Sequence, residues 1–201
     1  DRLSNDTAQL FVYFPPGNYK ITRTLHSPKD RTITGFALIG HGRSSVIVWD
    51  GAAGEPMFKS HGLRYGRYVG TVWDGSGKAG TGHLHEGPQC YQTHIRYQHM
   101  GFRNMTQDGI YASQEGGYAT AEVFYENCLF ENCRRAGIFL NSFNIYNHML
   151  DACEFRGNNT GISINKSCAY VWNTHFENNE LDLKVNGVHG TVKRISVRST
   201  E

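Results

Sequence analysis

The sequence predicts an all-β fold, a parallel β-helix in which short strands stack turn upon turn along one axis. Four similar segments recur in the second half of the chain. Each places a Phe at the equivalent position: Phe102, Phe130, Phe155 and Phe176, spaced by 28, 25 and 21 residues. A short apolar strand follows each segment, and apolar residues alternate with period two rather than in a helical pattern. A repeat of this size cannot bury its apolar side chains alone, so it must stack on its neighbours.

Length and composition favour one elongated domain over residues 1–201. We expect entry strands over residues 1–50, loop-rich coils over 51–93 and regular rungs over 94–201. A formal net charge of +2 gives no reason to expect nucleic acid or an anionic membrane as partner, and no apolar run approaches a membrane span. Because the chain starts abruptly at Asp1 and ends on strand-like sequence, we expect a fragment of a longer protein.

The first elements are predicted in chain order from their apolar runs and turn residues. Residues 11–21 form a strand, a Pro-Gly turn and a second strand, and residues 32–40 and 46–49 form two more. Trp49 and Trp73, each followed by Asp-Gly, are expected at equivalent places on successive coils.

Two irregular stretches follow, and both are expected to be longer loops: residues 52–68 and 76–93. In a β-helix, loops of this kind shape the groove in which a ligand binds.

The entry segment resembles that of a known family. Its motifs are Pro15-Pro-Gly17-Asn-Tyr19, Leu38-Ile-Gly40-His-Gly42 and Ser45-x-Ile47, and they resemble the start of the pectate-lyase-like β-helix superfamily. Asp6-Thr7-Ala8 is similar to the start of that superfamily's capping helix. Only three residues separate Ala8 from Val12, however, which predicts a shortened cap. The resemblance, with the usual hand of parallel crossovers, implies a right-handed coil. It also implies a secreted or cell-surface protein that acts on polysaccharides by β-elimination or glycoside hydrolysis.

Five cysteines are present, an odd number that leaves at least one free. Aligning the repeats puts Cys128 and Cys153 at the same rung position, after Met100 and before Thr174. We expect them to pack inside the coil as small apolar residues. No C-x-x-C spacing suggests zinc.

Two sets of outward residues are expected to be structural ladders. One alternates in charge from rung to rung: Arg103, Glu131, Arg156 and Glu177. The other follows the apolar strands and consists of amides: Asn141, Asn165 and Asn186.

The candidate catalytic pair is Glu126 and Asp151, in an outward column that begins at Gln98 and continues to Trp172. On successive rungs the two carboxylates lie about 5 Å apart at backbone level. They could serve as a general acid and base, or hold a calcium ion through oxygen ligands. Trp172 would offer a face for a sugar ring. The alternative is a solvated polar surface.

Further candidates surround this pair. Glu154 and His175 share a neighbouring outward column, where His175, or the loop residue His99, could act as a supplementary acid or base. Arg96 and Arg103 are candidates to neutralise the carboxylate of an acidic sugar.

Two other groups are weaker candidates. Tyr111 and Phe139 share an outward column and could stack on a sugar, or be covered by a loop or another subunit. His83 and His85 share a face of a strand and, with Glu86 or His94, could bind a transition metal, although their spacing matches no zinc motif.

The leading functional hypothesis is a polysaccharide lyase or glycoside hydrolase that uses Glu126 and Asp151. No cofactor other than calcium is predicted, and polysaccharide is the expected partner. The alternative is a non-catalytic stalk, adhesin or glycan-binding module that forms a homo-oligomer. The ladders suit both readings equally, because function resides in a site rather than in a fold.

Overall fold

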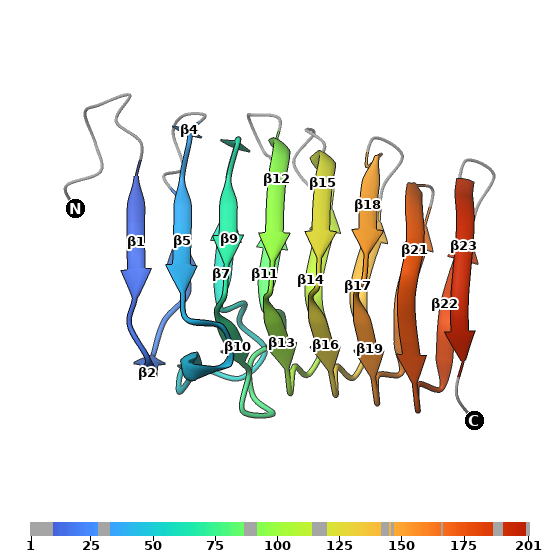
Figure 1. Cartoon of the computed structure of the whole chain (residues 1–201). Helices are drawn as coiled ribbons and strands as arrows, with labels where there is room; N and C mark the ends of the chain where they lie inside the picture. Colours follow the sequence, from blue (N-terminus) through green and yellow to red (C-terminus); the bar gives the residue numbers. More distant parts are fainter. Residues whose placement is uncertain are drawn as a thin grey trace.

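The computed structural model describes residues 10–27, 33–86, 92–113, 120–141, 145, 147–165 and 167–186, and the backbone of 191–199. The chain coils into a right-handed parallel β-helix with three faces, in which every strand pairs in parallel with the strand one coil away (Figure 1). The predicted fold is therefore confirmed. Asp6, Thr7 and Ala8 lie outside the described residues, as does Cys90.

The first face consists of strands that lie side by side in Figure 1: β1 (Phe11–Phe14), β5 (Ala37–Gly40), β9 (Arg67–Val69), β12 (Gln92–Gln98), β15 (Thr120–Glu126), β18 (His148–Asp151), the first part of β21 (Cys168–Glu177) and β23 (Thr191–Ser199). Two short strands, β4 (Ile33–Thr34) and β8 (Leu63–Arg64), extend it.

The second face follows after a bend in each coil: β2 (Gly17–Ile21), β6 (Ser45–Trp49), β10 (Val72–Asp74), β13 (Gly101–Arg103), β16 (Leu129–Glu131), β19 (Glu154–Arg156) and the second part of β21. The third face closes the coil: β3 (Leu25–His26), β7 (Phe58–Ser60), β11 (His83–His85), β14 (Asp108–Ser113), β17 (Ala136–Asn141), β20 (Thr160–Asn165) and β22 (Leu181–Asn186). A 3-10 turn, η1 (Gly42–Ser44), precedes β6.

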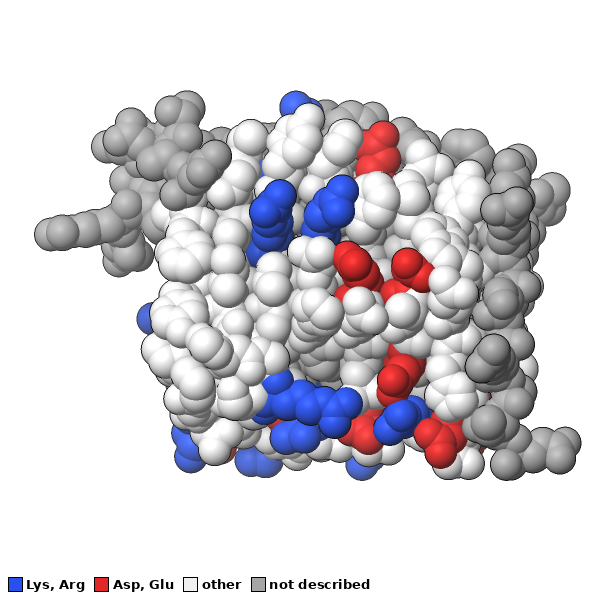
Figure 2. Space-filling model, viewed as in Figure 1, with Lys and Arg blue, Asp and Glu red and all other residues white. Residues whose placement is uncertain are grey.

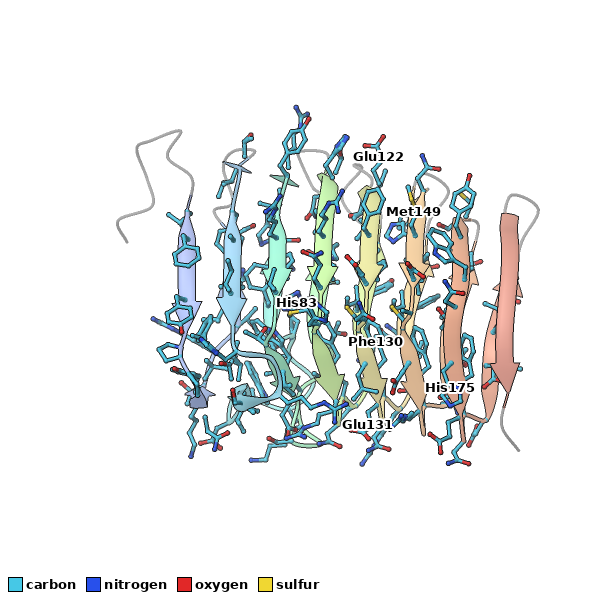
Figure 3. The ribbon with its side chains drawn as sticks, in the orientation of Figure 1. His83, Glu122, Phe130, Glu131, Met149 and His175 are labelled. Atoms are coloured by element: carbon cyan, nitrogen blue, oxygen red, sulfur yellow. The ribbon has the colours of Figure 1, made fainter. Side chains whose placement is uncertain are left out.

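The core is organised by a stack of phenyl rings. The rings of Phe102, Phe130, Phe155 and Phe176 follow one another at centroid distances of 5.4, 4.8 and 5.2 Å, with interplanar angles of 14° or less. All four side chains are buried (Phe130 is labelled in Figure 3). Their predicted equivalence is thus confirmed. Stacked rings of this kind stabilise a core by about 0.5–1.5 kcal/mol per pair beyond the area they bury.

The cysteine prediction also holds. Cys128 and Cys153 are buried at the same position of successive rungs, between Met100 and Thr174. Cys128, Cys133, Cys153 and Cys168 are all free thiols.

The bends are made by residues in the left-handed (αL) region. Between the first and second faces these residues are Gly70, His99, Asn127, Ala152 and Asn173, and after the second face they are Asn104, Asn132, Gly157 and Asn178. Their φ angles lie between 50° and 61°. Asn and Gly predominate because they tolerate this conformation best. Much of the glycine and asparagine in the rungs therefore lies at the corners of the coil.

Ala152 is an exception that yields a prediction. It adopts a φ of 51° between Asn127 and Asn173, where a residue with a Cβ and no amide is strained. Replacement by Asn should raise the free energy of unfolding by about 1 kcal/mol and Tm by about 2–4 °C. Thermal and urea unfolding measure this. Ala152→Gly should have an effect of the same sign if backbone strain is the cause, and a loss of stability in both variants would contradict it.

Two expectations about the first hundred residues were wrong. The stretches expected to be loops contain β7, β8, β9 and β11, because short buried segments continue the coil there despite their irregular spacing. Trp73 pairs with Ile47 rather than Trp49, while Trp49 pairs with Ile21 one coil earlier. The alignment of the two coils on their Asp-Gly dipeptides was therefore wrong by two residues.

Candidate functional site

The predicted carboxylate pair lies on the outer side of the first face. Glu126 ends β15 and Asp151 ends β18, and the two residues are direct partners in adjacent parallel strands. Gln98 precedes them and Trp172 follows, so the predicted register is confirmed. Gln98 Nε2 donates a hydrogen bond to Glu126 Oε2 (2.8 Å), and Asn173 Nδ2 donates one to Asp151 Oδ1 (3.0 Å). Both carboxylates are partly exposed, each held by a side-chain amide.

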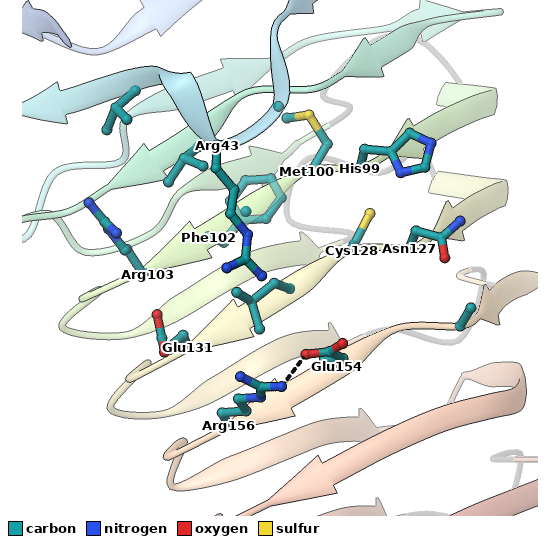
Figure 4. Close-up of a pocket in the computed structure, with 16 residues that line it drawn as sticks. Arg43, His99, Met100, Phe102, Arg103, Asn127, Cys128, Glu131, Glu154 and Arg156 are labelled. Carbon is teal, nitrogen blue, oxygen red and sulfur yellow. Dashed lines mark ion pairs between the residues drawn. The ribbon is translucent and has the colours of Figure 1, made fainter. Parts of the chain in front are cut away.

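A groove of about 360 Å³ lies beside this pair, at the bend between the first and second faces (Figure 4). The bend residues His99, Asn127 and Ala152 line it. Glu126 and Asp151 immediately precede Asn127 and Ala152 in the chain, although neither carboxylate lines the groove itself. His99 is exposed there, so the structure brings this predicted residue close to the pair.

Charged side chains from the second face and η1 complete the groove. Arg43 reaches over it from η1, and Glu154 lies on the opposite side (Figure 4). Arg156 forms ion pairs with Glu154 (2.6 Å) and Glu177 (3.2 Å). Within the part of the chain that the structure describes, no carboxylate pairs with Arg43. Arg43 is therefore the groove's available cation.

Arg103 also lines the groove but is already engaged. Its Nε donates to Asp74 Oδ2 at 2.8 Å. Burial alone would raise the pKa of Asp74, but hydrogen bonds from Asn104 and the Ser76 N–H, together with Arg103, lower it below the usual value. Asp74 therefore stays ionised and holds Arg103 in place, which leaves less of that guanidinium for a substrate.

The predicted charge ladder is in register. Arg103, Glu131, Arg156 and Glu177 are successive partners, and Asp74 extends the column by one rung. Such exposed pairs contribute on the order of 0–1 kcal/mol each. Glu154 and His175 are partners in the next outward column, as expected (His175 is labelled in Figure 3).

Basic and acidic side chains separate on the first face (Figure 2). A second outward column of this face contains Arg67 and Arg96 and continues with Phe124, over whose ring the Arg96 guanidinium lies at 4.9 Å. The carboxylate pair lies farther along the axis. A ligand lying along this face would therefore meet cations first, then carboxylates, then the partly exposed Trp172.

His83 and His85 are not metal ligands on the surface. Both are fully buried inside the coil, because β11 is a strand of the third face that turns these side chains inward. His85 Nε2 and the Tyr97 hydroxyl lie 2.6 Å apart, and Ser60 Oγ lies 2.8 Å from His85 Nδ1. No group of three metal-ligating side chains occurs among the described residues. The stretch was expected to be a loop, but interior hydroxyl and amide groups lie within hydrogen-bond distance of both ring nitrogens of His85 and of Nδ1 of His83. His83 Nε2 has no hydrogen-bond partner among the described residues.

Tyr111 and Phe139 are stacked at 5.2 Å, as the register predicted, but on the third face, away from the carboxylate pair. The guanidinium of Arg135 lies over both rings, at 4.9 and 4.8 Å. The Arg135 side chain of the same protein chain therefore covers the Tyr111 and Phe139 rings. The Asn ladder beside it is present, since Asn165 Nδ2 donates to Asn141 Oδ1 at 2.6 Å.

The repeats give no signal for Arg43, because it comes from an irregular turn outside the rungs. Asn127 and Ala152 could have been found from the repeats, because a polar or small residue recurs after each outward carboxylate. The described residues include no helix long and apolar enough to cross a membrane.

Comparison with known proteins supports the fold. No family model matches the chain, and no curated protein matches it. A solved structure of Geobacillus virus E2 ORF18 aligns with 83% of this chain at a TM-score of 0.67 and 18% identity. The chain spans about a third (34%) of the length of that viral protein. The A-module of the mannuronan C-5 epimerase AlgE4 from Azotobacter vinelandii aligns with 94% of this chain and 90% of its own at 10% identity. Its TM-score of 0.22 is too low to support an argument.

Proposed function

We propose that this chain binds a polysaccharide along its first face and cleaves a glycosidic bond with Glu126 and Asp151. The observation that carries the proposal is the pairing of two carboxylates on adjacent rungs, each one residue before a residue that lines the groove. A rung spacing of about 4.8 Å suits the separation of about 5–5.5 Å that retaining glycoside hydrolases use.

The chemistry would follow the retaining scheme. One carboxyl group donates its proton to the oxygen of the leaving sugar, while the other attacks the anomeric carbon and forms a glycosyl ester. Water then attacks that ester, the first group removes the proton from the water, and both carboxyl groups return to their initial state. Arg43 and Arg96 would favour sugars that carry acidic groups, and Trp172 would stack on a neighbouring ring. A polymer of this kind would be met outside the cell, at the surface or after secretion.

A second candidate is a binding module without catalysis. It is favoured by one observation: each carboxylate already accepts a hydrogen bond from a side-chain amide of a flanking rung, as members of a structural ladder do.

The test is a panel of acidic and neutral polysaccharides, assayed for reducing ends and for unsaturated uronides, with calcium or with a chelator. We expect new reducing ends without unsaturated product. Unsaturated product that depends on calcium would instead indicate a lyase with the carboxylates as cation ligands. Binding without product would favour the binding module.

Glu126→Gln and Asp151→Asn should each lower kcat by about 10²–10⁴-fold, because each removes a group that transfers a proton or attacks. The matched control is Glu180→Gln, since Glu180 also accepts a side-chain amide hydrogen bond from the preceding rung (Asn159 Nδ2, 2.7 Å) but belongs to another part of the coil. Activity that survives both substitutions in folded protein would rule out this pair.

A further inference from the structure

A third column of αL residues lies near the start of the first-face strands. It comprises Gly35, Tyr65, His94, Glu122 and Asn147, with φ angles of 83°, 54°, 57°, 56° and 56°. The pairs that flank it fix its register: Thr34 with Arg64, Thr93 with Ala121, and Val123 with His148. The other two columns use mainly Asn and Gly, whereas this one places Tyr, His and Glu on three consecutive rungs. Such residues are strained in this region, and strain of this kind is concentrated at functional sites.

The three side chains support one another on the surface. The rings of Tyr65 and His94 lie 4.8 Å apart at their centroids, tilted by 32°. His94 Nδ1 lies 3.1 Å from Glu122 Oε2, and the Thr93 hydroxyl donates to the same oxygen at 2.9 Å. Glu122 therefore holds the His94 ring in place, and the His94 ring packs against one side of the Tyr65 ring. Glu122 is labelled at the edge of the face in Figure 3.

Gly35, which precedes Tyr65 in this column by one rung, has no side chain that could cover the ring. Tyr65 is accordingly 57% exposed, among the most exposed large apolar side chains described. The column therefore presents a flat aromatic ring that is held from one side and left uncovered on the other. Arg64 and Arg67, both exposed, flank it in the chain.

We infer that Tyr65 is a sugar-stacking subsite, separate from the carboxylate pair, which takes the pyranose ring of a glycan on its uncovered face. A rigid aromatic ring offers a large contact area at low entropic cost, and the neighbouring arginines supply hydrogen-bond donors for hydroxyl or acidic groups. Glu126 lies four positions after Glu122 on β15, about 13 Å along an extended strand. Tyr65 would therefore bind a sugar unit of the same glycan that lies several units away from the one at the carboxylate pair. This inference rests on the proposed glycan binding but not on cleavage.

The test measures affinity and stability together. Binding of polygalacturonate, alginate, xylan and dextran is measured by affinity electrophoresis and calorimetry, using the Glu126→Gln variant so that cleavage does not interfere. In this background, Tyr65→Asn should weaken binding more than tenfold while Tm stays level or rises by about 2–4 °C, because Asn relieves the αL strain. Tyr65→Phe should bind within about threefold of the parent, since stacking needs the ring and not the hydroxyl. Leu181→Asn, at another exposed apolar residue on the third face, is the control.

The outcomes separate the two proposals. Binding that is unchanged in Tyr65→Asn overturns the subsite and leaves the proposed cleavage standing. Tyr65-dependent binding in a protein without cleavage activity supports the subsite and overturns the catalytic proposal. Failure of all four polymers to bind overturns both.

Discussion

Lowering the pH from 7 to 5 is expected to destabilise this coil by several kcal/mol, because three imidazoles are sealed inside it. His83, His85 and His148 are all fully buried. Burial lowers the pKa of His85 to about 4, although a hydrogen bond with Gln92 opposes the shift. Burial lowers the pKa of His148 to about 3, against the effect of its hydrogen bond to the Thr120 carbonyl. Burial, and then the charge of His85, lower the pKa of His83 well below its usual value.

The sign follows from proton binding. In the unfolded chain a His takes up a proton near pH 6.5, whereas the folded protein does so only at much lower pH. The stability that these residues contribute is therefore complete above pH 6.5 and is lost as the pH falls toward 4 for His85 and 3 for His148. Each His should cost about 2 kcal/mol by pH 5, at 1.36 kcal/mol per pH unit.

Urea unfolding between pH 7 and 5 measures this loss of stability. Ordinary carboxylates titrate below this range and therefore contribute little to it. His83→Phe should reduce the slope by about 1.4 kcal/mol per pH unit. The substitution suits a site packed against the rings of Phe58, Trp73 and Phe102. Ile110→Leu, at the position paired with His83 on the next rung, is the control and should leave the slope unchanged. A parent protein whose stability is flat over this range would show that the imidazoles are not sealed.

Replacing Arg135 by Met is expected to cost about 3 kcal/mol of folding free energy, because it leaves the buried Asp108 without its cation. Asp108 is fully buried, and Arg135 Nε donates to both of its carboxylate oxygens, at 2.9 and 3.1 Å. Burial raises the pKa of Asp108, and the hydrogen bonds and charge of Arg135 oppose that rise. Without Arg135 the carboxylate must either stay ionised in an apolar setting or bind a proton.

Arg134→Met is the matched control, since it removes the same charge from an exposed neighbour. The cost of Arg135→Met should be larger at pH 8 than at pH 5, because protonation of Asp108 relieves it. Adding Asp108→Asn should recover part of the loss. Equal losses in the two arginine variants would show that net charge, and not this pair, is responsible.

The repeated segments allowed the later rungs to be predicted almost residue by residue. The outward columns that contain Glu126, Glu154 and Arg103 are all in the predicted register, because period-two alternation leaves only one face for each apolar residue. Between residues 50 and 93 the spacing is irregular, and the strands there were not predicted. There, His83 and His85 follow the pattern of inward residues but have the chemistry of outward ones.

The site was only partly predictable for a related reason. Repeats specify residues that recur, so they identified the carboxylate pair and the bend beside it. Arg43 and Tyr65 depend on an irregular turn and on a backbone conformation that Tyr rarely adopts. Neither has a signal in a single sequence, because αL positions are normally recognised from Gly or Asn.

The spacing of the outward columns is set by main-chain hydrogen bonds between rungs, and not by the side chains that stand in them. Any residue substituted into a column therefore inherits the same period of about 4.8 Å. A substitution therefore changes the side chain at a rung but not its distance along the axis from the side chains of the neighbouring rungs. A protein built this way can alter which chemical groups meet a polymer, one rung at a time, while the distances between them stay the same.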